Sequence, residues 1–177
     1  MKAVAKRTKG YKLSYKKKSA TTDSYLPRGG SRSVSVCGSC QAVYMNKRWY
    51  SGVEVYNTAV QKPATVTMVC PACLKIRDNF PGGIVTLKGD YVLPHKQDLI
   101  KLIKNEEERA RGLNPLERVM SVKENGYGSL VISTTNEKLA QRIGRAIKKA
   151  FHGEVIYRWS HENKLVRVDW VREIEAS

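Results

Sequence analysis

The stretch VCGSCQAVYMNKRWY, residues 36–50, and the stretch MVCPACLKIR, residues 68–77, each contain two cysteines three positions apart. Each C-x-x-C turn puts two thiolates on one knuckle, and two knuckles supply the four sulfur ligands of a tetrahedral zinc site, with Zn–S distances of about 2.3 Å. Because the protein then fills all four coordination positions, no position is left for a catalytic water. The sequence therefore predicts one structural Zn2+ in a zinc ribbon, with the ligands Cys37, Cys40, Cys70 and Cys73.

Two other uses of these cysteines stay open. A rubredoxin-like iron site has the same four ligands and transfers electrons. Thioredoxin-type redox chemistry needs a C-x-x-C pair at the N-terminus of a helix, which the sequence indicates for neither pair. Structural disulfides are disfavoured, because nothing at the N-terminus resembles a signal peptide. We therefore expect a cytoplasmic protein, in which thiols stay reduced.

The charge of the chain is strongly positive, with 32 Lys and Arg against 16 Asp and Glu and a formal net charge of +16. Residues 1–35 hold ten of the basic residues and one acid, so more than half of the surplus lies there. A basic arm is typical of nucleic-acid binding, because contacts to phosphates release condensed counterions. An anionic membrane surface is the competing partner, but the arm lacks the amphipathic apolar face that inserts into one.

Composition and turn signals divide the chain into three parts. Residues 1–33 are a basic arm rich in Lys, Ser, Thr and Gly, which we expect to be disordered unless bound. Residues 34–93 contain short β segments around the cysteine pairs and are the predicted zinc ribbon. Residues 94–175 are predicted to form the order αββαββ. The predicted class is therefore α+β: a four-cysteine zinc ribbon followed by a permuted ferredoxin-like antiparallel-sheet domain, with its first strand moved to the end and both helices on one face.

The helix predicted over residues 137–152, with Asn136 as its N-cap, has a basic stripe opposite its apolar face. The stripe consists of Lys138, Arg142, Arg145 and Lys149. An ordinary solvated face is the alternative interpretation. Because the stripe contains no acid and belongs to a basic chain, it favours contact with phosphates.

The final predicted hairpin carries three aromatic residues, Tyr157, Trp159 and Trp170. They lie either in the core or on an open sheet face, where they would stack on bases. The RNP-type aromatic signature of RNA-recognition domains is absent, which favours the core.

Motifs of catalysis are missing from the sequence. We find no nucleophile motif and no phosphate-binding glycine loop, and His95, His152 and His161 are scattered without matching partners. We therefore expect no enzymatic activity and no small-molecule substrate.

The segments CGSCQAVYMNKRW (residues 37–49) and CPACLKIRDNFPGGIVTLKG (residues 70–89) resemble a zinc ribbon of the archaeal and eukaryotic large-ribosomal-subunit export adaptor family. LVISTTNEKLAQRIGRAIKKAFHGEVIYRW and VRVDWVR resemble the domain that follows that ribbon, and the same tail domain occurs in small bacterial proteins with one ribbon. The resemblance covers about residues 36–173 and implies binding to ribosomal RNA at the large subunit, with the four cysteines in a structural zinc site. This chain has one ribbon where the adaptor has two, and it lacks the adaptor's C-terminal domain. These departures favour assembly, hibernation or quality control over nuclear export.

Together these features predict a zinc-stabilised cytoplasmic protein that binds ribosomal RNA on the ribosome, on the large subunit. A zinc-ribbon DNA-binding transcription regulator and a rubredoxin-like electron carrier are the alternatives. The predicted RNA contacts are Lys6, Arg7, Lys9, Lys12, Lys16, Lys17, Lys18, Arg28, Arg32, Lys47, Arg48, Lys138, Arg142, Arg145 and Lys149.

Overall fold

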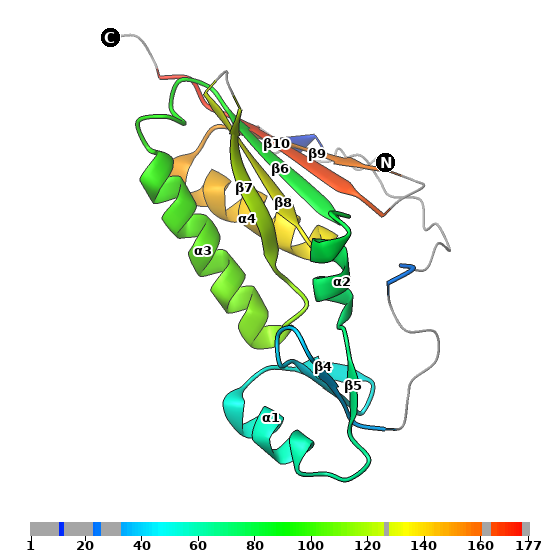
Figure 1. Ribbon diagram of the computed structural model, residues 1–177. Coiled ribbons are helices and arrows are strands. Elements are labelled where there is room, and N and C mark those ends of the chain that lie inside the picture. The colour runs from blue at the N-terminus through cyan, green and yellow to red at the C-terminus, as the bar shows by residue number, and fades with distance from the viewer. Residues whose placement is uncertain (1–10, 13–22, 26–32, 126–127, 161–163, 175–177) are drawn as a thin grey trace, which may run out of the picture.

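The computed structural model describes residues 11–12, 23–25, 33–125, 128–160 and 164–174, and it arranges them in two mixed β-sheets with four helices (Figure 1). The chain is therefore of the α+β class. None of the helices in these ranges is long and apolar enough to cross a membrane. The elements are β1 (Tyr11–Lys12), β2 (Ser35–Cys37), β3 (Val43–Met45), β4 (Arg48–Tyr50), α1 (Val53–Val60), β5 (Val66–Met68), α2 (Pro71–Arg77), β6 (Gly83–Lys88), α3 (Lys96–Leu113), β7 (Val119–Asn125), β8 (Ser129–Thr134), α4 (Glu137–Phe151), β9 (Glu154–Trp159) and β10 (Val166–Val171).

The larger sheet has six strands in the order β1-β9-β10-β6-β8-β7. Helix α4 packs on its middle strands and α3 packs beside α4, so that both helices lie on one face of the sheet (Figure 1). The strands and helices share one core, in which Leu87, Ile132, Ile143 and Trp170 are fully buried. The larger sheet and its two helices are therefore one packed unit.

Helix α4 begins at the residue that the sequence predicted. The side chain of Asn136 accepts a hydrogen bond from the backbone N–H of Leu139 at 3.0 Å, which satisfies one free donor of the first turn. Further along, Gly144 lies where α4 approaches the sheet closely: a Cβ at this position would lie 2.6 Å from the Cγ1 of Val168. The missing side chain of Gly144 therefore allows the observed spacing between helix and sheet.

Strand β6 differs from the prediction. Its sequence GIVTLK lies within residues 34–93, which we expected to form the zinc ribbon, but it pairs in parallel with β10 and antiparallel with β8. The physical reason is that buried and partly exposed residues alternate along β6. Val85 and Leu87 lie on the side that faces the helices and are fully buried in the core of the larger sheet. The larger sheet is thus mixed rather than antiparallel. Since β6 separates β8 from β10, the permuted ferredoxin-like arrangement is not confirmed.

The smaller sheet has the strand order β4-β3-β2-β5, and α1 packs against β2 and β3. Strands β3 and β4 form a hairpin through Asn46 and Lys47, whose φ angles of 50° and 62° are both left-handed, as a two-residue turn of type I′ requires. Behind this turn the rings of Tyr44 and Trp49 are buried, with their centroids 5.2 Å apart. The sequence predicted short strands in this region and missed the helices α1 and α2.

Two short pieces of the basic arm are described, and both contact the rest of the chain. Strand β1 pairs in parallel with β9, and the Asp23 carboxylate forms an ion pair with the Lys75 ammonium at 2.6 Å. The disorder predicted for the remainder of residues 1–33 concerns residues 1–10, 13–22 and 26–32, which lie outside the described ranges.

Candidate metal centre

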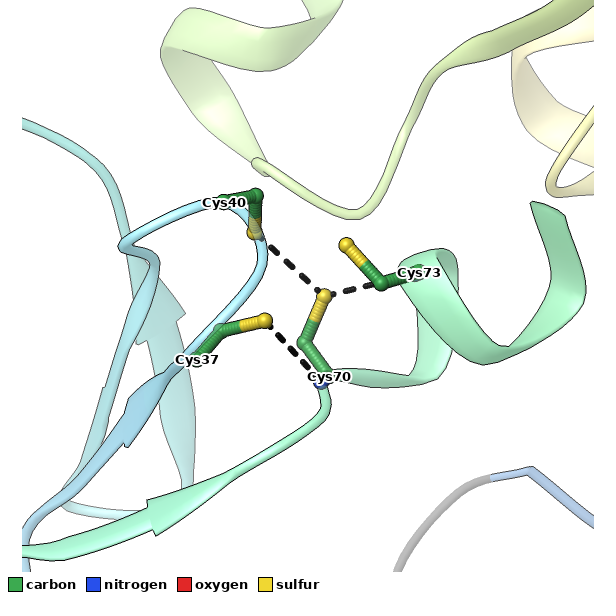
Figure 2. Close-up of side chains that lie close together, drawn as sticks. All are labelled: Cys37, Cys40, Cys70 and Cys73. Atoms are coloured by element: carbon green, nitrogen blue, oxygen red, sulfur yellow. Dashed lines mark hydrogen bonds between the residues drawn. The ribbon is translucent and has the colours of Figure 1, made fainter. Parts of the chain in front are cut away.

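The four cysteines come together where the smaller sheet meets α2 (Figure 2). Cys37 is the last residue of β2, Cys40 lies in the turn that follows, and Cys70 and Cys73 belong to the start of α2. Their Sγ atoms all lie within 4.8 Å of one another, and the close-up shows the sulfurs directed toward a common centre. The structure therefore unites the four residues that the sequence predicted as ligands.

The first knuckle is a tight turn held by backbone hydrogen bonds. The N–H of Gln41 donates to the carbonyl of Cys37 at 2.9 Å, and the N–H of Cys37 donates to the carbonyl of Ala42 at 2.8 Å. Gln41 has a φ of 62°, a left-handed conformation that reverses the chain within the turn. The backbone alone thus presents Cys37 and Cys40 on the same side.

The second knuckle is the N-terminus of α2, which corrects the expectation that neither cysteine pair begins a helix. Cys70 is the N-cap, Pro71 follows it in the first turn, and the N–H of Cys73 donates to the Cys70 Sγ at 3.4 Å. Proline suits this position because the first N–H groups of a helix have no intrahelical acceptor. The Sγ of Cys70 nevertheless lies 3.6 Å from the Sγ of Cys40 on the other knuckle. The Cys70–Cys73 pair is therefore part of a four-sulfur cluster, whereas a redox pair of the thioredoxin type has no further cysteines beside it.

Hydrogen bonds and burial shift the pKa values of the thiols in opposite directions. The contact with Cys70 lowers the pKa of the Cys40 thiol, and the same contact raises the pKa of Cys70. Burial raises the pKa of Cys73 to about 11. Four thiolates this close repel one another, so full ionisation of the set needs a cation among the sulfurs.

Arg118 contacts the cysteine cluster, and the sequence did not indicate this contact. It lies just before β7, and its Nη1 donates to the Sγ of Cys73 at 3.6 Å, while its Nε donates to the carbonyl of Pro115 at 2.8 Å. Burial lowers the pKa of Arg118, but its hydrogen bond with Cys40 and the charges of the thiolates outweigh burial and raise it. A permanent cation thus lies beside the sulfurs and offsets the negative charge of a four-thiolate metal site.

The geometry and chemistry of the four sulfurs fit one metal ion. A tetrahedron with metal–sulfur distances of about 2.3 Å has sulfur–sulfur edges of about 3.8 Å, and the separation of Cys40 and Cys70 is 3.6 Å. The backbone N–H of Cys70 donates to the Sγ of Cys37 at 3.3 Å, a hydrogen bond that stabilises a thiolate. Soft sulfur ligands in this number suit zinc and also iron. The site can therefore hold one metal ion.

Two of the predicted RNA contacts lie on the β3–β4 hairpin, whose turn is at the opposite end of β3 from the Cys37–Cys40 turn. Lys47 and Arg48 are exposed at the β3–β4 turn, whereas the neighbouring Trp49 is buried in the core of the smaller unit. The hairpin therefore presents two exposed cations next to a buried tryptophan.

Three of the four residues in the predicted basic stripe on α4 are exposed, and the fourth lies near an acid. Lys138, Arg145 and Lys149 are exposed, but Arg142 is half-buried and its Nε lies 3.8 Å from a carboxylate oxygen of Glu106 on α3. The stripe therefore borders an acid from the neighbouring helix, which the sequence of α4 alone did not indicate. The side chain of Lys12 and the remaining arm residues lie outside the described part of the chain: Lys6, Arg7, Lys9, Lys16, Lys17, Lys18, Arg28 and Arg32.

The aromatic residues of the β9–β10 hairpin belong to the core, as the sequence favoured. Trp170 is fully buried and Tyr157 is 6% exposed, while Trp159 is half-buried and packs against them. The indole N–H of Trp170 donates to the carbonyl of His152 at 2.7 Å, which satisfies the buried donor. These side chains therefore do not form an open stacking platform.

Comparison of the chain with protein-family models, curated proteins and solved structures finds no match.

Proposed function

We propose that this chain is a zinc-stabilised, non-enzymatic cytoplasmic protein that binds ribosomal RNA on the large ribosomal subunit, in assembly, hibernation or quality control. The observation that carries this proposal is the surplus of 16 positive charges, concentrated in residues 1–35. A surplus of this kind binds polyanions by releasing counterions, whatever their sequence. Ribosomal RNA is the polyanion that agrees best with the motifs of this chain.

Zinc is the metal that we propose for the four-cysteine site, in a purely structural role. Residues Cys37, Cys40, Cys70 and Cys73 would hold it, and all four coordination positions would then belong to the protein. The metal would join the smaller sheet to α2 and so hold the Lys47–Arg48 turn in a fixed place. Metal analysis and the absorption spectrum of the purified protein test this, because zinc is colourless and a tetrathiolate iron site is coloured.

The choice of the large subunit rests on a resemblance to the export adaptor family. It covers the cysteine-containing segments, residues 37–49 and 70–89, and the later segments, residues 130–159 and 166–172. The exposed cations Lys47, Arg48 and Arg145 lie outside the arm and would add contacts to the phosphates that the arm neutralises. Such contacts position the protein on the RNA and carry no sequence information.

A competition experiment separates this function from the main alternative, a DNA-binding regulator. Labelled ribosomal RNA fragments bound by the zinc-loaded chain are competed with unlabelled ribosomal RNA and with duplex DNA over a series of salt concentrations. We expect ribosomal RNA to compete more strongly than duplex DNA at every salt concentration. Preference for the duplex would overturn the proposal and favour the regulator.

A further inference from the structure

A cavity of about 340 Å3 lies between α2, the loop before β7 and the start of α4. Its lining contains three lysines and two acids, together with small and polar residues. The charged members are Asp23, Lys75, Glu137, Lys138 and Lys164. The cavity is separate from the metal centre, although α2 contributes to both.

Lys75 is the buried cation of this cavity. Its side chain is 8% exposed, and its ammonium donates to the Asp23 carboxylate at 2.6 Å and to the carbonyl of Thr135 at 3.1 Å. A buried ammonium needs an anionic partner, because removing it from water without one is very unfavourable. The carboxylate beside Lys75 comes from the basic arm and not from the two sheets.

The arm segment that supplies this carboxylate rests on α2 and the loop after it. The hydroxyl of Tyr25 donates to a carboxylate oxygen of Asp78 at 3.1 Å, and its ring lies 5.4 Å from that of Phe80. The N–H of Tyr25 also donates to the second carboxylate oxygen of Asp23 at 3.0 Å, which orients that group toward Lys75. These contacts are exposed or only part-buried and involve few residues, so the segment can leave at a low cost compared with opening a core.

We infer that this cavity is a phosphate-binding site and that the Asp23 carboxylate occupies it within the same chain. Among the described residues of the lining, the three lysines face two acids when Asp23 is present; without it, Glu137 is the remaining acid, and the surplus of positive charge rises by one. A phosphate group replaces the carboxylate beside Lys75, and its further oxygens face Lys138 and Lys164 at the rim. Lys138 is exposed and Lys164 half-buried, so both can turn toward such a ligand.

The site couples phosphate binding to the position of the arm. Because the Asp23 carboxylate and a phosphate group compete for Lys75, each one weakens the binding of the other by the same factor. A phosphate in the cavity therefore releases residues 23–25 from α2. The identification of that phosphate with the backbone of an RNA rests on the proposed function, whereas the site itself does not.

The test is a titration of the 15N-labelled, zinc-loaded full chain with inorganic phosphate, followed by the backbone amide signals of residues 72–75 and 135–138. Asp23→Asn removes the competing charge and keeps the shape of the side chain. Asp90→Asn is the matched control, since Asp90 is an exposed acid in the turn after β6 and does not line the cavity.

We expect phosphate to shift these amides saturably, with a dissociation constant at least about fivefold lower in Asp23→Asn than in the wild type or in Asp90→Asn, which is the lower end of typical coupling. In the Asp23→Asn background, Lys75→Gln should abolish the shifts. If Lys75→Gln does not fold, Lys138→Gln, a change at an exposed position, should weaken phosphate binding. Two results would show that Lys75 only anchors the arm and would overturn the inference. One is an equal affinity for phosphate in Asp23→Asn and the wild type; the other is that phosphate shifts only amide signals outside the cavity.

A parallel titration with a short single-stranded RNA identifies the source of the phosphate. RNA that shifts the cavity amides and is displaced by inorganic phosphate assigns the site to the nucleic-acid backbone. Binding of inorganic phosphate but not RNA keeps the site and removes its link to the proposed function. RNA binding without any response at the cavity keeps the proposed function and overturns the assignment of the cavity to the RNA backbone.

Discussion

The guanidinium of Arg118 lies 3.6 Å from the Sγ of Cys73, and this contact connects the larger unit to the metal centre. Arg118 also uses its backbone N–H to donate to the hydroxyl of Thr135 at 2.9 Å, next to the start of α4. One residue therefore links the sulfurs, the loop before β7 and the end of β8.

Replacing Arg118 tests whether this link supports the metal. Arg118→Met removes the cation and keeps much of the side-chain volume, so the affinity for zinc should fall by about 10- to 100-fold, as for other groups that support metal ligands. Competition with a chromophoric chelator measures the affinity. Arg111→Met is the control, because Arg111 is an exposed arginine at the end of α3. An unchanged affinity in Arg118→Met would show that the contact is incidental.

Loss of one metal ligand should unfold the smaller unit selectively. Cys40→Ser removes a sulfur from the set, and the smaller sheet has only small clusters of buried side chains besides the metal centre. The amide signals of residues 35–68 should therefore collapse toward unfolded positions, while those of β6, β8 and β10 keep their dispersion. Ser39→Ala changes an exposed residue of the same knuckle and should leave the spectrum intact. A folded smaller sheet in Cys40→Ser would contradict a structural role of the metal.

Lys47 offers a way to separate backbone strain from charge. Its φ of 62° is a left-handed conformation that costs an ordinary residue roughly 1–2 kcal/mol, so Lys47→Gly should raise the free energy of unfolding by up to about 1 kcal/mol after the entropy of glycine is counted. The same change should weaken RNA binding, because it removes an exposed cation. Lys47→Gln, which keeps the strain, should lose the same RNA affinity without gaining stability. If both variants bind RNA as the wild type does, the turn makes no contact with RNA.

Replacing either of two helical glycines by alanine should change the stability of the fold, in opposite directions. In Gly144→Ala the new Cβ would lie 2.6 Å from the Cγ1 of Val168 and 3.1 Å from the hydroxyl of Tyr157, so overpacking should destabilise the fold by about 1–3 kcal/mol. In Gly112→Ala, within α3, the Cβ meets nothing within 4 Å, and the higher helix propensity of alanine should stabilise by about 0.5–1 kcal/mol. Denaturant unfolding measures both. Equal effects on the free energy of unfolding would contradict the close contact of α4 with the sheet at Gly144.

The sequence predicted the parts of the structure that depend on local patterns. The spacing of the cysteines was sufficient to find the four-cysteine cluster that could hold a metal ion, and the cap at Asn136 together with the apolar period of α4 was sufficient to find that helix. The aromatic residues of the final hairpin were correctly favoured as core, because the sequence lacks the RNP-type aromatic signature of an open stacking face.

The sequence could not predict the parts that depend on contacts between distant residues. Strand β6 begins ten positions after Cys73, and its pairing with β10, more than 75 positions later, shows that it belongs to the larger sheet. Arg118 and the Asp23–Lys75 ion pair depend in the same way on tertiary structure. The helix α2 was hidden because its seven residues are too short for a periodic pattern.

Sedimentation with ribosomes tests the central claim most directly. The zinc-loaded full chain is mixed with ribosomes from the organism that encodes it and separated on sucrose gradients over a series of salt concentrations. We predict that the protein sediments with the large subunit at low salt and moves to the top as the salt concentration rises, because phosphate contacts weaken with salt. Deletion of residues 1–33 should lower the salt concentration at which release occurs. A protein that stays at the top of the gradient even at low salt would contradict the account.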